Sequence, residues 1–189
     1  MSDTYRKILD VAYNLIVKQG YTATSIRQIA EEAGIGKATV YHHFKDKESI
    51  AYALLAMRTN EMQDLLNTIG NVQDPVERLK KAAFESMCIL MYSAEVFQII
   101  RREIPQSRDK LQNSLVSFFK EYTALLTESL KTGIDAGLFR SIEPEEATKV
   151  FLCVLQGTFA SVYITGEKPK SPEKMVNSIL DIFLNGIMK

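Results

Sequence analysis

Seven side chains that can donate hydrogen bonds lie within eleven consecutive positions near the start of the chain: Lys37, Thr39, Tyr41, His42, His43, Lys45 and Lys47. Ammonium, hydroxyl and imidazole groups donate to phosphate oxygens and to the edges of DNA bases. A solvated face of a helical bundle rarely needs two His and a Tyr beside its lysines. The cluster therefore favours a surface that binds double-stranded DNA over an ordinary solvated helix face.

Two short helices joined by a glycine-containing turn would present this cluster. Ser25 stands where a helix N-cap belongs, and apolar residues repeat behind it at helical spacing, at Ile26, Ile29, Ala30 and Ala33. Gly34 would end that helix, and a second one would start at about Lys37 with Val40 and Phe44 on its inward side. This spacing predicts a helix-turn-helix, whose second helix can enter a DNA major groove. The alternative is an ordinary corner between two helices of a bundle.

The segment GIGKATVYHHFKDKESI resembles the DNA-reading helix of the TetR family of bacterial transcription regulators. The upstream segments TATSIRQIAEEAG and YRKILDVAYNLIVKQGY resemble the two helices that precede it in that family. The resemblance covers residues 4 to 55 and many positions at fixed spacing. It implies an all-α protein with a three-helix DNA-binding domain over residues 1–47 and a helical ligand-binding and dimerisation domain over residues 48–189.

Helix start and stop residues extend the all-α prediction along the whole chain. Three residue pairs that contain Pro mark helix starts. Asp74-Pro75 places an N-cap before a Pro at the first helical position. The last two helices start at Glu143-Pro144 and Ser171-Pro172. A first helix is predicted over 4–19, and no strand pattern appears downstream of the helix-turn-helix. The later helices are predicted over 46–68, 74 to a break near Ser93, 95–104, 107–136, 144–165 and 172–188, which gives about nine in total.

Composition is ordinary for a soluble globular protein, with 46% hydrophobic and 24% charged residues and a net charge of zero, and a cytoplasmic location is expected. Residues 1–47 hold seven Lys and Arg against five Asp and Glu, so few phosphate contacts per subunit are expected and dimerisation would be needed for useful affinity. No signal peptide or membrane-spanning run is predicted. Cys88 and Cys153 are isolated, which indicates two reduced thiols; a redox-sensing pair is the alternative.

Four residues are predicted to face the bases in the DNA groove. Lys37 begins the reading helix, where its ammonium could reach a guanine edge. Ala38, or the methyl group of Thr39, could contact a thymine methyl. Arg27 would project toward the groove from the preceding helix.

Phosphate contacts are predicted from the resemblance for Tyr41 and His43, which lie where the family commonly makes them. Lys47 begins the fourth helix, where its ammonium and the backbone N–H groups could bind one phosphate. Ser25 could cap its helix and bind phosphate as well. For His42, contact with DNA and a merely exposed or packed ring are both open.

The last two predicted helices are apolar on more than one face. A large core within one chain would explain this, and so would a homodimer interface built as a four-helix bundle from two such pairs, which we prefer. The family resemblance implies the same interface. The predicted interface residues are Phe151, Val154, Leu155, Val162, Ile179, Phe183 and Ile187. A two-fold dimer would place its reading helices about one DNA turn apart (~34–36 Å), so a palindromic operator is expected.

Met and aromatic residues are frequent in the middle of the chain, where plain core and an adaptable apolar cavity are the two explanations. The candidate ligand-binding residues are Met87, Met91, Tyr92, Phe97, Ile100, Phe118, Tyr122, Phe151 and Phe159. The resemblance implies that a small, mostly apolar inducer bound there would change the spacing of the reading helices and release a repressor from DNA. Such release requires a different affinity of the inducer for the two conformations.

Nothing in the sequence favours an enzyme. There is no phosphate-cradling glycine loop, metal-ligand spacing or nucleophile elbow, so no cofactor or metal is expected. The main alternative keeps the helix-turn-helix but uses the C-terminal domain to recruit a protein partner, as a nucleoid-associated or division factor would. A solid core with a large exposed patch would favour that alternative, and a ligand-filled cavity would favour the inducible regulator.

Overall fold

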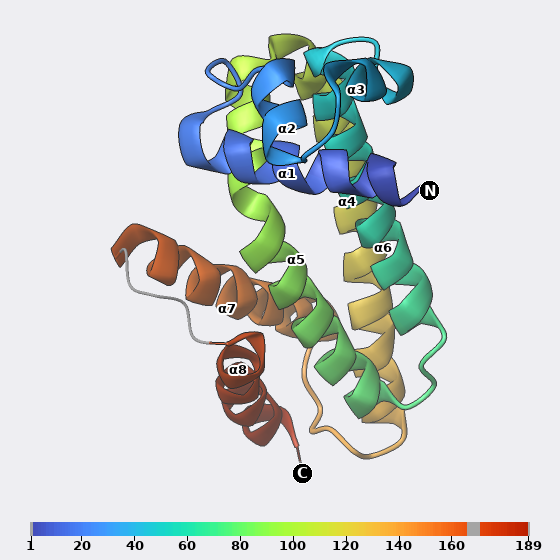
Figure 1. The fold of residues 1–189 in the computed structure, drawn as a ribbon. Coiled ribbons are helices and arrows are strands. Elements are labelled where there is room, and N and C mark those ends of the chain that lie inside the picture. The colour runs from blue at the N-terminus through green and yellow to red at the C-terminus, as the bar shows by residue number, and fades with distance from the viewer. Residues whose placement is uncertain (1, 166–170, 189) are drawn as a thin grey trace. The chain divides into compact units, whose positions relative to one another are not determined.

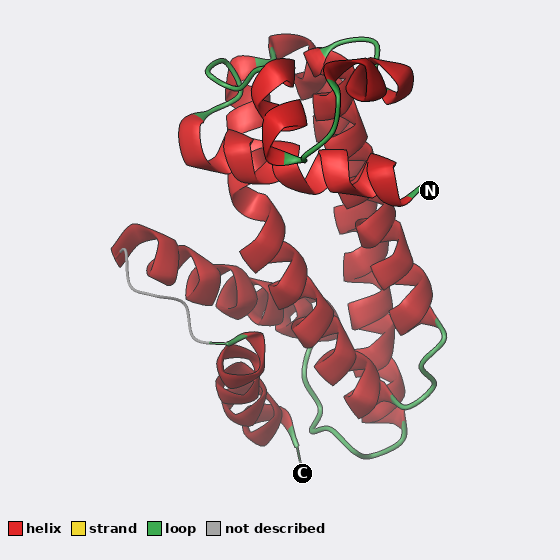
Figure 2. Ribbon diagram, viewed as in Figure 1, coloured by secondary structure: helices red, strands yellow, loops and turns green. Residues whose placement is uncertain are grey.

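A computed structural model of the chain describes residues 2–165 and 171–188, without the side chains at 92–95, 97, 101, 110, 162 and 163. The described helices are α1 (Asp3–Gln19), α2 (Ile26–Glu32), α3 (Lys37–His43), α4 (Lys47–Gly70), α5 (Pro75–Glu103), the 3-10 turn η1 (Pro105–Ser107), α6 (Arg108–Asp135), α7 (Pro144–Thr165) and α8 (Pro172–Ile187) (Figure 1). Figure 2 shows these residues as helices and loops alone, so the all-α prediction is confirmed. No helix among them is long and apolar enough to cross a membrane.

Local side-chain chemistry starts the helices where the sequence predicts. At the start of α4, the Asp46 carboxylate accepts a hydrogen bond from the Ser49 backbone N–H at 2.7 Å. At the start of α5, the Asp74 carboxylate accepts one from the Glu77 backbone N–H at 2.8 Å. These bonds satisfy N–H groups that have no partner within the helix. Helices α5, α7 and α8 begin at Pro75, Pro144 and Pro172.

The predicted break near Ser93 does not occur, because α5 runs without interruption to Glu103. Residues 76–103 contain neither Pro nor Gly, so nothing in the backbone requires the helix to stop. The chain leaves the helix just before Pro105, which begins η1. The predicted total of nine helices is met among the described residues only because η1 takes the place of the helix predicted over 95–104.

The chain divides into two compact units, of which unit 1 comprises residues 1–60 and 93–115. Its core joins the inward faces of α1, α2 and α3 to the first half of α4, through side chains such as Ile8, Ile29, Val40 and Ile50. The last turns of α5 and the first turn of α6 complete this core, with Val96, Ile100, Ile104 and Leu111. Unit 1 thus contains residues 1–47 together with segments from later in the chain, and the predicted division into domains over 1–47 and 48–189 stays a prediction.

Unit 2 comprises residues 61–92 and 116–189. Its core is built from the second half of α4, the first part of α5 and the helices α6, α7 and α8. α7 packs against α8 through the rings of Phe151 and Phe183, whose centroids are 4.8 Å apart. The buried ring of Phe139, in the loop after α6, packs directly on Gly133 of that helix. A Cβ atom built on Gly133 would lie 2.1 Å from this ring.

Candidate functional site

α2 and α3 are joined by a turn over residues 33–36 that forms the predicted helix-turn-helix. Gly34 has a φ of +63°, a conformation that glycine adopts without steric cost. The Ile35 backbone N–H donates to the Ala30 carbonyl oxygen at 3.0 Å. At the other end of α2, Ser25 and Gln28 form a capping box, in which each side chain binds the other residue's backbone N–H. Both helices of the motif are thus fixed by local hydrogen bonds.

α3 is anchored to the rest of unit 1 along one side only. Val40 has no exposed surface, and Phe44, which follows the helix, is also buried. The ring of Tyr5 on α1 stacks on the Phe44 ring at a centroid distance of 4.8 Å. Ile29 and Ala30 of α2 belong to the same core. The opposite side of α3 is therefore held in a fixed direction while it stays open to solvent.

Four of the predicted DNA-binding residues lie on that open side: Lys37, Ala38, Tyr41 and His42. The Tyr41 side chain is 48% exposed, and the Lys37 ammonium lies 5.5 Å from the centroid of its ring. An ammonium group, a phenol hydroxyl and an imidazole on one helix face supply donors for base edges and phosphates. Ala38 is exposed on the same side, and its contact with a thymine methyl stays a prediction.

Thr39 and His43 are half-buried on α3, so they are less accessible than the four exposed residues. The His43 ring lies edge-on to the Tyr5 ring at 6.1 Å and edge-on to the His42 ring at 5.2 Å. These contacts orient His43 and leave part of its ring at the surface. The DNA roles of both residues stay predictions.

Ser25 and Arg27 lie at the exposed start of α2. The Ser25 hydroxyl accepts from the Gln28 backbone N–H at 3.2 Å and donates to the Gln28 side-chain oxygen at 3.0 Å, so capping already uses it as donor and acceptor. The Arg27 guanidinium pairs with Glu31 at 2.7 Å, with the Arg27 side chain 80% exposed. An ion pair this exposed is weak, and Arg27 could exchange Glu31 for a phosphate or a base edge.

Lys47 begins α4, as predicted, and its ammonium has partners within the chain. Its ammonium donates to the backbone carbonyl oxygens of Tyr21 at 2.7 Å, Thr22 at 3.2 Å and Thr24 at 2.7 Å. It also lies over the Tyr21 ring, 4.3 Å from the centroid. Partial burial lowers the pKa of Lys47, an effect that the carboxylate of Glu103 partly offsets. Phosphate binding by Lys47 stays a prediction, but here its three N–H groups bind the turn between α1 and α2.

Glu103 binds the same turn, and no sequence pattern pointed to it. Its carboxylate accepts from the Thr22 backbone N–H at 2.7 Å and from the Thr22 hydroxyl at 2.8 Å. The bond from the Thr22 backbone N–H is the main reason why the pKa of Glu103 lies below its usual value, with the Thr22 hydroxyl and Arg102 adding to it against the effect of burial. The two residues are 81 positions apart, so no local spacing could reveal the contact.

The candidate ligand-binding residues do not all gather in one place. Six belong to or pack on the core of unit 2: Met87, Met91, Phe118, Tyr122, Phe151 and Phe159. Ile100 lies in the core of unit 1, and the side chains of Tyr92 and Phe97 fall outside the described residues. Ligand binding by these residues stays a prediction.

Tyr122 is the one polar group among the six that lie in unit 2. Its hydroxyl lies 2.6 Å from the Ser86 hydroxyl and 3.1 Å from the Ala82 carbonyl oxygen, and the Ser86 hydroxyl donates to the same carbonyl at 2.6 Å. Burial raises the pKa of Tyr122 far above its usual value, so the phenol stays neutral. Its ring stacks on Phe118 at 5.4 Å. Hydrogen bonds within the protein therefore satisfy this buried hydroxyl.

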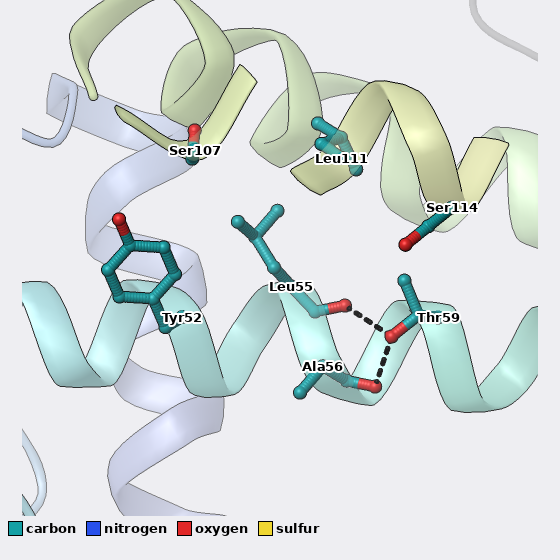
Figure 3. Close-up of a pocket in the computed structure, with 7 residues that line it drawn as sticks. All are labelled: Tyr52, Leu55, Ala56, Thr59, Ser107, Leu111 and Ser114. Atoms are coloured by element: carbon teal, nitrogen blue, oxygen red, sulfur yellow. Dashed lines mark hydrogen bonds between the residues drawn. The ribbon is translucent and has the colours of Figure 1, made fainter. Parts of the chain in front are cut away.

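A small pocket of about 100 Å³ lies in unit 1 between α4 and the start of α6 (Figure 3). Its lining comprises Tyr52, Leu55, Ala56, Thr59, Ser107, Leu111 and Ser114, none of which was predicted to bind a ligand. The Thr59 hydroxyl is directed to the carbonyl oxygens of Leu55 and Ala56, as the dashed lines show. This volume is below the ~300 Å³ typical of ligand pockets. We therefore assign no ligand to it.

Most of the predicted dimer-interface residues lie in the core of unit 2. Five of the seven are buried within a single chain: Phe151, Leu155, Ile179, Phe183 and Ile187. Val154 is half-buried against the same core, and the side chain of Val162 lies outside the described residues. A role for these seven residues in a dimer interface therefore stays a prediction, and the five buried ones already pack within one chain. The prediction selected the inward faces of α7 and α8, which look the same in the sequence as an interface would.

The outward faces of α7 and α8 carry a different set of apolar side chains. Val150 and Ile164 on α7 are 55% and 80% exposed, and Ile182 on α8 is 74% exposed. Between the two α7 residues, Cys153 and Gly157 are also exposed. Exposed aliphatic side chains at helical spacing, with small residues between them, are typical of a helix that packs against a partner.

Comparison with known proteins finds family models and relatives that together cover nearly the whole chain. A family model described as bacterial regulatory proteins of the tetR family matches residues 8–54, and one described as a tetracyclin repressor-like C-terminal domain matches residues 72–187. The uncharacterized HTH-type transcriptional regulator YvkB of Bacillus subtilis is 28% identical over 99% of this chain and 98% of its own. The HTH-type transcriptional repressor Rv1474c of Mycobacterium tuberculosis is 25% identical over 97% and 92%.

Solved structures show the same fold. A crystal structure of AibR in complex with isovaleryl coenzyme A and operator DNA covers 95% of this chain and 97% of its own, with a TM-score of 0.62 and 22% identity. No group of three or more His, Cys, Asp or Glu side chains among the described residues is arranged to hold a metal ion.

Proposed function

This chain belongs to the tetR family of bacterial regulatory proteins, and we propose that it represses transcription as a homodimer that binds a palindromic operator and leaves it when a small, mostly apolar molecule binds. The observation that carries the proposal is the open side of α3. There, Lys37, Tyr41 and His42 project from a helix that Val40 anchors in the core. A protein that binds chromosomal DNA acts in the cytoplasm, where we place it.

Dimerisation is supported by the exposed apolar side chains of α7 and α8. We propose that Val150, Ile164 and Ile182 pack against the same residues of a second copy, in place of the buried residues first predicted. In a two-fold dimer each contact occurs twice. The dimer would also double the number of phosphate contacts, which a chain of zero net charge needs for useful affinity.

The core of unit 2 supports the proposal that a small apolar ligand binds there. Met91, Phe118 and Phe159 are half-buried beside the fully buried Met87 and Phe151, and their side chains are apolar and adaptable. Such a lining favours an apolar molecule that enters by repacking these side chains. The relatives named above are a transcriptional regulator and a transcriptional repressor, which favours this proposal over a protein-recruiting division factor or an enzyme.

The proposal is tested with the wild-type protein and two substitutions on α3, using duplexes that carry a selected operator or a scrambled sequence. Lys37→Ala should lower the ratio of operator to scrambled affinity, since a bidentate contact to a base contributes about 1–3 kcal/mol of discrimination. Tyr41→Phe should weaken binding to both duplexes alike, because phosphate contacts carry no sequence information. If Lys37→Ala leaves the ratio unchanged, Lys37 does not read a base, and if wild type does not distinguish the two duplexes, the proposed function fails.

A further inference from the structure

We propose that Lys47 and Glu103 form a clamp on the turn over residues 20–24, and that this clamp positions α2 and α3 for DNA binding. Glu103 is then a positioning residue: it sets the affinity for the operator without touching DNA. This inference rests on the proposed function, because it assumes that α3 reads DNA. Lys47 is the first residue of α4 and Glu103 the last residue of α5. Both would hold the reading head, by which we mean the helix-turn-helix formed by α2 and α3.

Lys47 closes one side of the turn. Three carbonyl oxygens, of Tyr21, Thr22 and Thr24, surround its ammonium at 2.7 to 3.2 Å. An ammonium group has three N–H donors and no acceptor. All three donors are therefore used inside the protein, and a phosphate could bind Lys47 only if the ammonium gave up at least one carbonyl.

Glu103 closes the other side. One of its oxygens accepts both the backbone N–H and the hydroxyl of Thr22, and the other accepts from Arg102 at 3.1 Å. The Glu103 side chain is 16% exposed, whereas Arg102 is 73% exposed. Hydrogen bonds to a charged, largely buried carboxylate are stronger than those between neutral groups. The turn also passes close to this carboxylate at Gly20, where an added Cβ would lie 3.2 Å from it.

The clamped turn leads directly into the helix-turn-helix. Thr24 is buried, and its hydroxyl donates to the Gly20 carbonyl at 2.8 Å, so the turn is closed on itself. The next residue, Ser25, is the N-cap of α2. α2 in turn packs directly on α3. A displacement of the turn would therefore move the start of α2 and, with it, the open side of α3.

The clamp predicts that removing the Glu103 carboxylate weakens operator binding, whereas the loss of a negative charge alone would strengthen it. Removing a carboxylate from a DNA-binding unit ordinarily tightens binding, because DNA is a polyanion. If Glu103 positions the reading head, Glu103→Ala should instead raise the operator Kd by about ten- to a hundredfold, the effect of losing charge-assisted hydrogen bonds. Glu103→Gln keeps an oxygen that can accept from the Thr22 backbone N–H, so its Kd should lie between those of wild type and Glu103→Ala.

Salt dependence separates positioning from direct contact. The operator Kd is measured by fluorescence anisotropy between roughly 50 and 200 mM salt. A phosphate contact contributes about 0.9 to the slope of log Kd against log salt, or about 1.8 for a residue present twice in a dimer. We expect Glu103→Ala and Lys47→Met to raise Kd with the slope unchanged. A lower slope for Lys47→Met would make Lys47 a phosphate ligand and overturn its part in the clamp.

Glu32→Ala provides a matched control, since it removes an exposed carboxylate from α2. Its Kd should be unchanged or lower. Amide hydrogen exchange over residues 20–24 gives a readout that needs no DNA: the Thr22 amide should exchange faster in Glu103→Ala, while the core amides of α1 keep their protection as evidence of folding. If wild type binds no operator, the proposed function fails but this exchange test still decides the clamp. If Glu103→Ala binds the operator as tightly as wild type, the clamp does not position the reading head.

Discussion

Replacing Ile182 by Ala should separate the homodimer into folded monomers. Ile182 is 74% exposed on α8, so little of its side chain supports the core of its own chain. In the proposed dimer the exposed part is covered by the second copy. The substitution therefore acts on association and leaves the free energy of unfolding of the monomer nearly unchanged.

The magnitude follows from the exposed fraction. Ile to Ala removes three carbon atoms, worth about 2.4 kcal/mol at ~0.8 kcal/mol per buried CH₂. Scaled by the 74% of Ile182 that a partner can cover, the loss is about 1.8 kcal/mol per copy. Because an isologous interface contains the residue twice, the dimer loses about 3.5 kcal/mol, which raises its dissociation constant by about 300-fold.

Sedimentation equilibrium measures the dissociation constant directly. The matched control is Val116→Ala, a substitution of a 58% exposed side chain on α6, outside α7 and α8, which should not change it. Phe183→Ala is a second comparison: this buried side chain should cost about 3–5 kcal/mol of monomer stability. If Ile182→Ala leaves the dimer intact while Val116→Ala dissociates it, the interface lies on α6 and the assignment to α7 and α8 is wrong.

Three further predictions concern stability, each measured by urea unfolding. Gly133→Ala should destabilise the protein by about 1–3 kcal/mol or more, because the new Cβ would lie 2.1 Å from the buried Phe139 ring; Gly186→Ala, with nothing within 4 Å, should be neutral or stabilising. Ser25→Ala should cost about 1 kcal/mol through the lost N-cap of α2. The hydrogen bond from the Thr22 backbone N–H holds the pKa of Glu103 below its usual value, so the ionised form of Glu103 stabilises the fold. The stability difference between wild type and Glu103→Gln should be constant above about pH 5 and shrink as the pH falls through that lowered pKa. A difference that grew on acidification would contradict the hydrogen bonds from Thr22.

Features set by neighbouring residues could be predicted from the sequence. The Asp74 N-cap, the Gly34 turn and the proline helix starts each depend on chemistry within a few positions of the chain, and the structure has all of them. The open side of α3 followed from the spacing of Val40 and Phe44, which fixes the inward face. The resemblance over residues 4–55 added the role of that face in DNA binding.

Features that depend on distant contacts could not be predicted. The hydrogen bond from Thr22 to Glu103 joins residues 81 positions apart, and the use of Lys47 by the turn depends on the same packing. On α8, Phe183 and Ile182 are equally apolar neighbours, yet one fills the core and the other faces solvent. Periodicity identifies two apolar faces on such a helix but does not tell which of them its own chain covers.

The most direct test of a homodimeric operator-binding repressor is selection of bound fragments from the source genome by the purified protein at near-physiological salt. We expect recovery of one palindromic sequence whose half-site centres lie about one helical turn apart (~34–36 Å), as two α3 helices related by a two-fold axis require. Recovery of fragments that share no symmetric sequence, from a preparation shown to be free of bound ligand, would contradict the account.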